Sequence, residues 1–394
     1  MYQGYPGYNT GGVGGYPPVP PTGYAPQAYP PSPYSPQYPP AYNQPYGQPY
    51  GQPAYPPPAY PPAQYPPVAP QPIVQAPVAP PIYPPAQMGQ GADMDCQVLH
   101  GAMRGLGTDE NAIINIICSR NAAQRAEIRR RYIALYGKDL ISKLKDELSG
   151  NFEDTCVGLF MTPPEYDAYC LYKAMKGAGT NEGVLIEILG TRNNEEIQMI
   201  KAEFQKNYGK PLEKWITSET SGHFRKLLIS LIQANRSMNP VPDPMMCQND
   251  AQALYAAGEG RWGTDESTFI RIFTQRSAAE LDLISRNYQQ FRGKTLHHAI
   301  DKEFSGDTKS LLHTILEGLQ NPAAYFARRL RESVEGIGTN DSRLVRVMVS
   351  RCEIDLPLIK QEYRRIYGRD LIYDIRSDTS GDYKKILTYL LTRV

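Results

Sequence analysis

The first 92 of the 394 residues contain no charged side chain, although the chain as a whole has 41 basic and 40 acidic ones. The first 90 residues also lack leucine and phenylalanine, while they hold 29 of the 37 prolines and 15 of the 29 tyrosines. Such a segment cannot bury enough aliphatic surface to offset the entropy lost on ordering. We therefore predict a disordered tail followed by a globular remainder.

Long apolar runs, paired cysteines and a surplus of basic residues are also missing. No apolar run approaches the roughly 20 residues of a membrane span, and MYQGYPGYNT lacks both regions of a secretory signal. The net charge of +1 argues against nucleic acid as a partner. The six cysteines show no C-x-x-C spacing, and the five histidines fall in no metal or nucleophile motif. These absences predict a cytosolic, non-enzymatic protein with buried thiols and argue against a zinc site.

The tail consists of short Tyr-Pro and Pro-Pro units, as in PAYPPPAYPPAQYPPVAP. Proline fixes φ and disfavours helix at the preceding residue, so we expect extended polyproline II and coil. Three P-P-x-Y motifs, at residues 39–42, 57–60 and 80–83, suit the aromatic-lined groove of a WW domain, although so biased a segment also produces them by chance. Closely spaced tyrosines favour self-association as a second role.

The globular part repeats one pattern four times. Its Gly-Thr glycines are Gly107, Gly179, Gly263 and Gly338, spaced by 72, 84 and 75 residues. An arginine stands 13 residues after each glycine, and an acid followed by a short Ser-Gly turn stands 40 residues after it. The arginines are Arg120, Arg192, Arg276 and Arg351, and the acids are Glu147, Glu219, Glu303 and Asp378. Equal offsets in four copies predict four repeats of one structural unit.

The stretches between these marks have helical periodicity. In repeat 1, Ile113, Ile116 and Ile117 fall on one face at i, i+3, i+4 spacing. Thr108 and the two acids after it suit an N-cap and an acidic first turn. Besides a helix before Gly105, we predict helices at residues 111–119, 122–137, 139–148 and 152–161. With no strand-like alternation, the fold class is all-α, with five helices per repeat.

The same marks divide the chain into six segments. A linker that contains Pro240, Pro242 and Pro244 explains the 84-residue spacing. The predicted segments are a tail at 1–92, repeat 1 at 93–163, repeat 2 at 164–236, the linker at 237–246, repeat 3 at 247–320 and repeat 4 at 321–394.

The glycine loops and the acids suggest a shared role. A Gly-x-Gly-Thr turn leaves main-chain carbonyls exposed at a helix end, and the acid can complete an oxygen-rich site. Ca²⁺ takes about 6–8 oxygen ligands, so such an incomplete shell would also accept a phosphate oxygen of a lipid. In a single copy, a helix C-cap and an N-cap would explain the glycines and the acid. Four copies with one offset favour a calcium site.

Apolar residues occupy the expected loop tips, which are Leu106, Ala178, Trp262 and Ile337. An exposed Trp suits the membrane interface, and the basic neighbours suit anionic headgroups. These neighbours are Arg104, Lys176 and Arg261. The alternative is that the tip side chains fold back and pack against their own loops.

These motifs resemble those of the annexin family, calcium-dependent phospholipid-binding proteins with four repeats, over residues 93–394. The resemblance implies a slightly curved disc whose convex face carries the calcium loops. It also implies three main-chain carbonyl ligands and one carboxylate in every repeat. By position, the ligand sets are Met103, Gly105, Gly107 and Glu147; Met175, Gly177, Gly179 and Glu219; Gly258, Arg261, Gly263 and Glu303; and Val334, Gly336, Gly338 and Asp378.

The chain departs from the family pattern at Glu335, where many members carry a basic residue, and at Val334, which replaces a usual Met. Four residues match a polar axis associated with ion conduction in some annexins: Asp167, Glu187, Arg192 and Arg346. We prefer to interpret them as a buried ion-pair network that joins two halves of the core. The segment 53–56 with Tyr60 and Pro61 is similar to the ligand of a penta-EF-hand partner in long-tailed annexins.

The sequence thus predicts a cytoplasmic adaptor that calcium recruits to anionic, phosphatidylserine-like membranes in trafficking, fusion or repair. Two alternatives remain: a membrane ion channel through the polar axis, and a calcium-independent helical scaffold.

Overall fold

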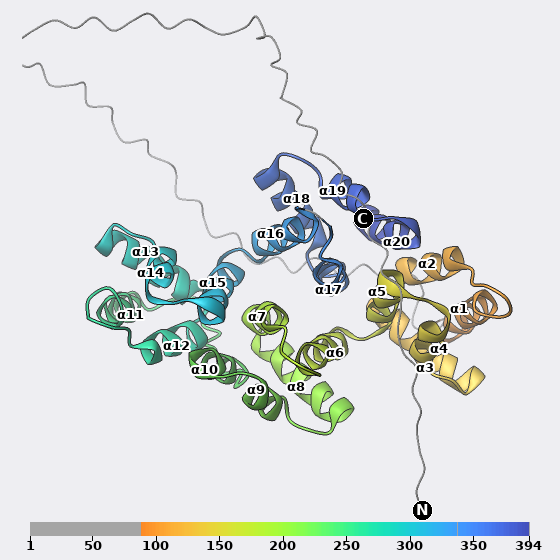
Figure 1. The fold of residues 1–394 in the computed structure, drawn as a ribbon, viewed down its shortest axis with the longest axis horizontal. Coiled ribbons are helices and arrows are strands. Elements are labelled where there is room, and N and C mark those ends of the chain that lie inside the picture. The colour runs from red at the N-terminus through yellow and green to blue at the C-terminus, as the bar shows by residue number, and fades with distance from the viewer. Residues whose placement is uncertain (1–87, 337, 394) are drawn as a thin grey trace, which may run out of the picture. The chain divides into compact units, whose positions relative to one another are not determined.

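The computed structural model describes residues 88–336 and 338–393 (Figure 1). The predicted WW and penta-EF-hand motifs of the tail, and the loop tip Ile337, lie outside these residues. Among the described helices, none combines the length and the apolarity that crossing a membrane requires. All six cysteines are free, and Cys170 and Cys352 are partly exposed rather than buried.

The described residues form twenty α-helices and no strand, with five helices in each repeat. Repeat 1 contains α1 (Met88–Ala102), α2 (Glu110–Ser119), α3 (Ala122–Tyr136), α4 (Leu140–Glu147) and α5 (Gly150–Phe160). Repeat 2 contains α6 (Pro163–Met175), α7 (Glu182–Thr191), α8 (Asn194–Tyr208), α9 (Leu212–Glu219) and α10 (Gly222–Leu231). Repeat 3 contains α11 (Pro244–Ala257), α12 (Glu266–Gln275), α13 (Ala278–Arg292), α14 (Leu296–Glu303) and α15 (Gly306–Gln320). Repeat 4 contains α16 (Pro322–Val334), α17 (Asp341–Arg351), α18 (Leu356–Tyr367), α19 (Leu371–Asp378) and α20 (Gly381–Thr392).

Local sequence explains most helix boundaries. The isoleucines at 113, 116 and 117 are buried as their spacing predicts, and α3 ends at Gly137, whose φ of 64° gives a left-handed C-cap. The N-cap of α2 is Asp109 rather than Thr108, because the Asp109 carboxylate accepts a hydrogen bond from the main-chain N–H of Ala112 at 3.0 Å. Thr108 is therefore available for another contact.

Two helices begin inside segments predicted to be irregular. α1 starts at Met88, within the predicted tail, and its apolar face buries Ala92, Cys96 and Leu99. Tertiary packing thus stabilises the first turn of α1, although that turn contains two glycines and no charged residue and has little helix propensity of its own. α11 starts at Pro244, within the predicted linker, because Asp243 caps it and proline is well suited to the first helical position.

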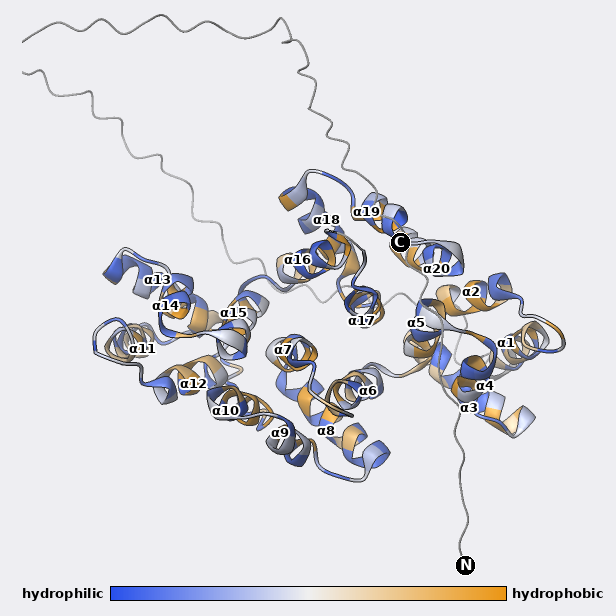
Figure 2. Ribbon diagram, in the orientation of Figure 1, coloured by the Kyte–Doolittle hydropathy of each residue, from blue (hydrophilic) through white to orange (hydrophobic). Residues whose placement is uncertain are grey.

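The helices pack into two hydrophobic clusters, which Figure 2 shows as orange faces turned toward neighbouring helices. One cluster joins repeats 1 and 4, where α20 packs against α2 and α5. The other joins repeats 2 and 3, where α15 packs against α7 and α10. α17 contacts both α5 and α6 and so links the two clusters. The candidate calcium-binding loops therefore connect helices that are packed into these two clusters.

The repeated arginines are structural links within this scaffold. In repeats 1 to 3, each binds an aspartate of the first helix. The pairs are Asp95–Arg120, Asp167–Arg192 and Asp250–Arg276, with N–O distances of 2.7, 2.7 and 2.5 Å. In repeat 4, Phe326 replaces that aspartate, and Arg351 binds Asp355 at 2.7 Å while its guanidinium lies 4.5 Å from the Phe326 ring centre.

Candidate calcium and membrane site

Each loop that carries a Gly-Thr glycine is closed by one main-chain hydrogen bond. In repeat 1, the N–H of Asp109 donates to the carbonyl of Ala102 at 2.9 Å. The other three repeats form the same bond between their counterparts, at 2.7 to 2.9 Å. The loop of repeat 3 is one residue longer, since its bond joins Asp265 to Ala257. This hydrogen bond holds the two ends of each loop together, and the loop residues project beyond the helix ends.

The glycines allow a course that other residues rarely adopt. Gly105 and Gly107 have φ values of 104° and 87°, and the glycine pairs of repeats 2 and 4 are similar. Among the described residues, no main-chain N–H bonds to the carbonyls of Met103, Gly105 or Gly107. These oxygens are therefore available as ligands for a hard cation.

Repeat 3 reaches its loop conformation differently. Only Gly263 has a positive φ there, of 79°. The carbonyl of Gly258 accepts a hydrogen bond from the N–H of Arg261 at 3.0 Å, so one of its lone pairs is already used. The carbonyl ligands that the family resemblance assigns are therefore not equivalent in all four repeats.

The four acids occupy the last residue of a helix in every repeat: Glu147 in α4, Glu219 in α9, Glu303 in α14 and Asp378 in α19. The N-cap position of the next helix is the serine two residues after each acid. An N-cap therefore does not explain the acids. A carboxylate at a helix C-terminus faces the negative end of the helix dipole, which is unfavourable by about 0.3–1 kcal/mol. Local helix stability thus does not account for four such placements.

Repeat 3 shows the closest contact between acid and loop. The hydroxyl of Thr264 donates to Oε2 of Glu303 at 2.6 Å. A Cβ placed on Gly258 would lie 2.9 Å from Cγ of Glu303, so only glycine permits this approach. The carboxylate is thus held against the loop, which confirms that the loop and the acid forty residues later lie side by side.

In repeats 2 and 4 the threonine hydroxyl instead bonds to the main chain of the acidic residue. Thr180 donates to the carbonyl of Glu219 at 3.2 Å, and Thr339 donates to that of Asp378 at 3.1 Å. The carboxylates themselves accept from the preceding serines, at 3.1 and 2.9 Å. In these two repeats the loop threonine therefore bonds to the main chain of the acidic residue, and its carboxylate accepts from the serine before it.

Repeat 1 differs again, because Glu147 is paired with Lys143 one turn earlier in α4. Both side chains line a pocket of about 370 Å³ together with Met103, Arg104 and Gly105 of the loop. The lining also includes His100, Tyr132, Tyr136 and Lys138. The acid thus lines the same pocket as the loop, but a cation has to compete with the lysine ammonium for its carboxylate.

The loop tips are exposed where the structure describes them. Leu106 and Trp262 have relative exposures of 108% and 101%, so neither side chain folds back onto its loop. Arg104, Lys176 and Arg261 are exposed as well. An apolar tip with a basic neighbour is therefore accessible to an external surface in repeats 1 and 3.

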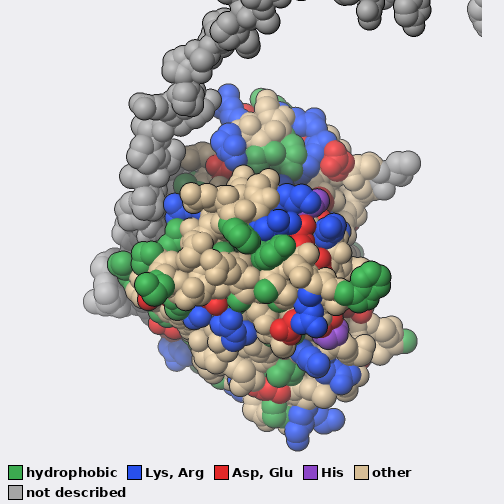
Figure 3. Space-filling view, turned by 90° about the vertical axis from the view of Figure 1, so that its left-hand side faces the viewer, with side chains coloured by type: hydrophobic (Ala, Val, Ile, Leu, Met, Phe, Trp, Pro, Cys, Tyr) green, Lys and Arg blue, Asp and Glu red, His purple; other side chains and the backbone are tan. Residues whose placement is uncertain are grey.

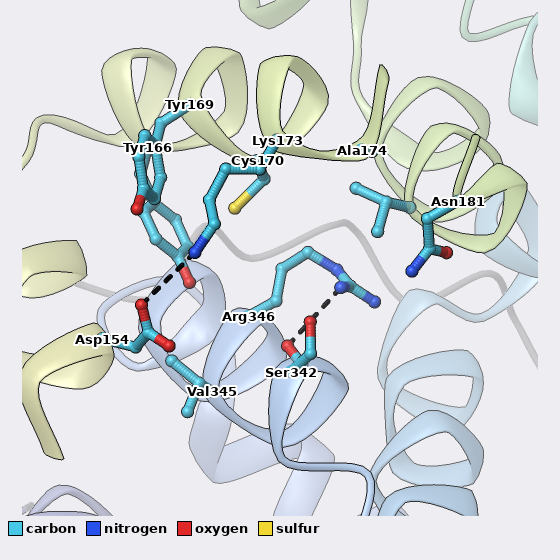
Figure 4. A pocket seen from close by; sticks show the side chains of 11 residues that line it. Asp154, Tyr166, Tyr169, Cys170, Lys173, Ala174, Asn181, Ser342, Val345 and Arg346 are labelled. Carbon is cyan, nitrogen blue, oxygen red and sulfur yellow. Dashed lines mark hydrogen bonds and ion pairs between the residues drawn. The ribbon is translucent and has the colours of Figure 1, made fainter. Parts of the chain in front are cut away.

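The four polar-axis residues form two buried, bidentate ion pairs. Asp167 binds Arg192 within repeat 2 at 2.7 and 2.9 Å, and Glu187 of α7 binds Arg346 of α17 at 2.7 and 2.8 Å. Burial raises the pKa of Glu187, but the Arg346 guanidinium outweighs it and leaves the pKa below its ordinary value. Arg346 also lines a cavity of about 200 Å³ between α5, α6, α7 and α17 (Figure 4). The Glu187 pair thus connects repeats 2 and 4.

Sequence reasoning missed two features of this surface. It assigned the loop threonine to a helix cap, although the repeated Gly-Thr spacing was a signal for the hydrogen bond that this threonine donates to the acidic residue in repeats 2, 3 and 4. It also found no cluster among the five histidines, whereas the structure brings together His297 and His313, which are 16 residues apart on different helices. No spacing rule for a single helix or loop would have found that pair.

Fold and site together define a class of protein: all-helical, with four five-helix repeats, each placing a carbonyl-rich loop beside a carboxylate. The annexin family model matches residues 94–159, 166–231, 249–315 and 325–390. Annexin A11 of Oryctolagus cuniculus is 48% identical over 293 residues, which cover 74% of this chain and 58% of that protein. Annexin A4 of Rattus norvegicus is 46% identical over 305 residues, covering 77% of this chain and 96% of that protein. The chain belongs to the annexin family.

Solved structures of annexins have the same fold as this chain. Annexin III matches with a TM-score of 0.75 and 43% identity, over 76% of this chain and 93% of that one. The calcium-bound structure of annexin (Sm)1 matches with a TM-score of 0.69 and 34% identity, over 79% of this chain and 92% of that one. The chain spans 58% of the length of annexin A11 and 60% of that of human annexin A7, so the activities of those whole proteins do not transfer directly.

Proposed function

We propose that this protein binds anionic phospholipid membranes when calcium occupies its loops. The observation that carries the proposal is the recurrence, at four helix C-termini, of a carboxylate that lies beside a glycine loop. The carboxylates are poorly placed for helix stability, and a cation that neutralises them removes the penalty. Membership of the annexin family and the calcium-bound annexin (Sm)1 structure support this proposal.

The donor chemistry fits Ca²⁺, which prefers oxygen ligands in a flexible geometry. In every repeat the three loop carbonyls would be joined by the acid, with the sets assigned above by position. Bound calcium would supply a positive charge at which a lipid phosphate oxygen can complete the shell. Glu335, beside the loop of repeat 4, is exposed and is paired with Arg331 at 3.0 Å. It stands where repeats 1 and 2 have the basic Arg104 and Lys176, so repeat 4 should attract anionic lipid least.

We further propose that the protein acts as a non-enzymatic, cytoplasmic adaptor that is peripheral on membranes while calcium is raised. In this view the proline-rich tail recruits WW-domain or penta-EF-hand partners or associates with itself. The two polar-axis pairs favour a structural role over the channel alternative, because each guanidinium is bound to a carboxylate through two N–H groups.

Co-sedimentation of the full chain with phosphatidylserine vesicles tests the main proposal. We expect pelleting with calcium and none with a chelator. Replacing Glu147, Glu219 and Glu303 by Gln and Asp378 by Asn, all in one variant, should abolish the response, whereas Asp146→Asn, at the exposed neighbour of Glu147, should not. Equal pelleting with and without calcium would reject the proposal in favour of a calcium-independent scaffold.

A further inference from the structure

Two histidines from neighbouring helices of repeat 3 meet at the surface. Nδ1 of His297 on α14 lies 2.8 Å from Nδ1 of His313 on α15. The rings are stacked, with an interplanar angle of 10° and centres 5.0 Å apart. Both side chains are half-buried. Figure 3 views the side of the molecule on which α13 and α14 lie in Figure 1, and it shows histidine at the surface among side chains of both charge signs.

A carboxylate orients one of these rings. Nε2–H of His313 donates to Oδ1 of Asp301 at 3.1 Å, and Asp301 is in turn held by Lys309 at 2.8 Å. With its proton on Nε2, the neutral His313 ring presents a lone pair on Nδ1, toward His297. Metal-binding histidines typically donate their second ring nitrogen to a carboxylate in this way.

Glu317 supplies a third donor. It stands one helical turn after His313 on α15, so both side chains share a face of that helix. One ligand atom from each of His297, His313 and Glu317 lies within 4.8 Å of the others. Oε2 of Glu317 accepts from Arg328 at 2.5 Å, which leaves Oε1 available.

We propose that His297, His313 and Glu317 form a binding site for Zn²⁺ that is separate from the calcium loops. Two imidazoles and a carboxylate match a common three-residue zinc set, which leaves a fourth position for water, and nitrogen donors do not suit calcium. Zn–N bonds of about 2.0–2.1 Å in a tetrahedron put neighbouring ligand atoms about 3.3 Å apart. The two Nδ1 atoms, now 2.8 Å apart, therefore have to separate by about half an ångström, and both rings have to turn so that their lone pairs point at the ion. The Glu317 oxygen has to close in from a separation of up to 4.8 Å. The metal would join α14 to α15.

Binding requires a small rearrangement of protons. In the metal-free protein, Nδ1–H of His297 donates to Nδ1 of His313. When zinc binds both Nδ1 atoms, the proton of His297 moves to its Nε2 through solvent, so no net proton is released. The exposure of the site leaves a path for the ion.

Titration of the full chain with Zn²⁺ and with Co²⁺, in saturating calcium that occupies the loops, tests the proposal. We expect one Zn²⁺ per chain by calorimetry and a visible Co²⁺ absorption band typical of tetrahedral nitrogen and oxygen ligands. Asp301→Asn should weaken binding by about 10–100-fold, and His297→Gln or His313→Gln should weaken it more. His298→Gln is the matched control, because His298 is the exposed neighbour of His297 on the same helix, and it should bind as the unchanged protein does.

Two results would overturn the proposal: no stoichiometric Zn²⁺ binding by the unchanged chain, or equal affinity in the His297→Gln, His313→Gln and His298→Gln variants. Glu317→Gln provides a further variant if a histidine substitution disturbs folding, as judged by helical circular dichroism. It should retain the fold and lower the affinity, and an unchanged affinity would remove Glu317 from the site.

Discussion

Repeats 1 and 3 have the same residue offsets but hold their acids in different ways. In repeat 3, Thr264 donates a hydrogen bond to Glu303, which lies directly on Gly258. In repeat 1, Glu147 is paired with Lys143 of its own helix. The residue at the position of Lys143 in repeat 3 is Ala299, which cannot form such a pair. One carboxylate is thus oriented toward its loop, and the other is already neutralised.

The difference shows that equal spacing predicts position but not electrostatic state. A carboxylate without a cationic partner attracts calcium with its full charge, whereas a paired carboxylate has to release its partner first. We therefore expect repeat 3 to bind calcium more tightly than repeat 1. Its tip residue, Trp262, is also larger than Leu106, so repeat 3 should contribute more to membrane contact.

The largest expected effect comes from removing each acid in turn. Glu303→Gln should raise the calcium concentration for half-maximal vesicle binding by about tenfold or more, since ligand charge sets calcium affinity. Glu147→Gln should raise it by about threefold at most, because that charge is already offset by Lys143. Vesicle sedimentation across a calcium series measures both. If the two variants were equally impaired, the proposed difference between the repeats would be wrong.

The next effect concerns the threonine hydroxyl. Thr264→Val removes the hydrogen bond to Glu303 with little change of shape and should raise the calcium requirement by about 2–10-fold, the equivalent of one hydrogen bond. Thr180→Val is the matched control, since that hydroxyl bonds to the main-chain carbonyl of Glu219 and leaves the carboxylate untouched. Calcium titration of both variants on vesicles decides the point, and equal effects would mean that the hydroxyl only stabilises the loop.

The loop tips should produce a smaller difference. Trp262→Ala removes an exposed indole from the membrane interface and should weaken vesicle binding at saturating calcium by about fivefold, or roughly 1 kcal/mol. Leu106→Ala should weaken it by about half that free energy. Vesicle affinity is the measurement, and thermal unfolding is the control, since neither fully exposed side chain supports the core. Unchanged vesicle affinity in both variants would assign membrane contact to other residues.

Much of the fold could be predicted because it depends on local signals. The isoleucine spacing and the left-handed glycine at 137 determine helices whose ends differ from the prediction by one or two residues. The start of α1 could not be predicted, since burial of Ala92 and Cys96 against other helices outweighs a sequence with no helix-start signal. Local propensity is a weak guide where tertiary packing supplies the stability.

For the site, the sequence predicted which segments of the chain lie side by side. The forty-residue offset correctly indicated that the acids lie beside the loops. It could not indicate that Lys143 neutralises Glu147. A lysine four residues before a glutamate is common on helix surfaces, and such a pair usually contributes little to stability, so the spacing alone does not mark it as significant. Nor could it bring His297 to His313, because that contact depends on how α14 packs against α15.

The smallest expected effect is an increase in calcium affinity, whereas the other substitutions lower calcium or vesicle affinity. Lys143→Gln should free Glu147 and lower the calcium concentration needed to occupy repeat 1 by about twofold, within the range of a partly exposed ion pair. Calorimetric calcium titration without lipid is the proper measurement. On anionic vesicles, loss of a positive charge would weaken lipid attraction by about 1 kcal/mol and hide the gain.

Lys145→Gln controls for the general loss of a positive charge. Lys145 lies on the same helix, but its ammonium is placed over the Tyr169 ring at 5.4 Å rather than at Glu147. If the Glu147 contact matters, only Lys143→Gln should increase calcium affinity without lipid. If both variants change the calcium affinity equally, the field around α4 rather than the specific pair sets that affinity. The electrostatic difference between the two acids would then be absent, and the hydroxyl contact of Thr264 would remain as the difference in how the acids are held. The two measurements thus separate the two causes that make these repeats unlike.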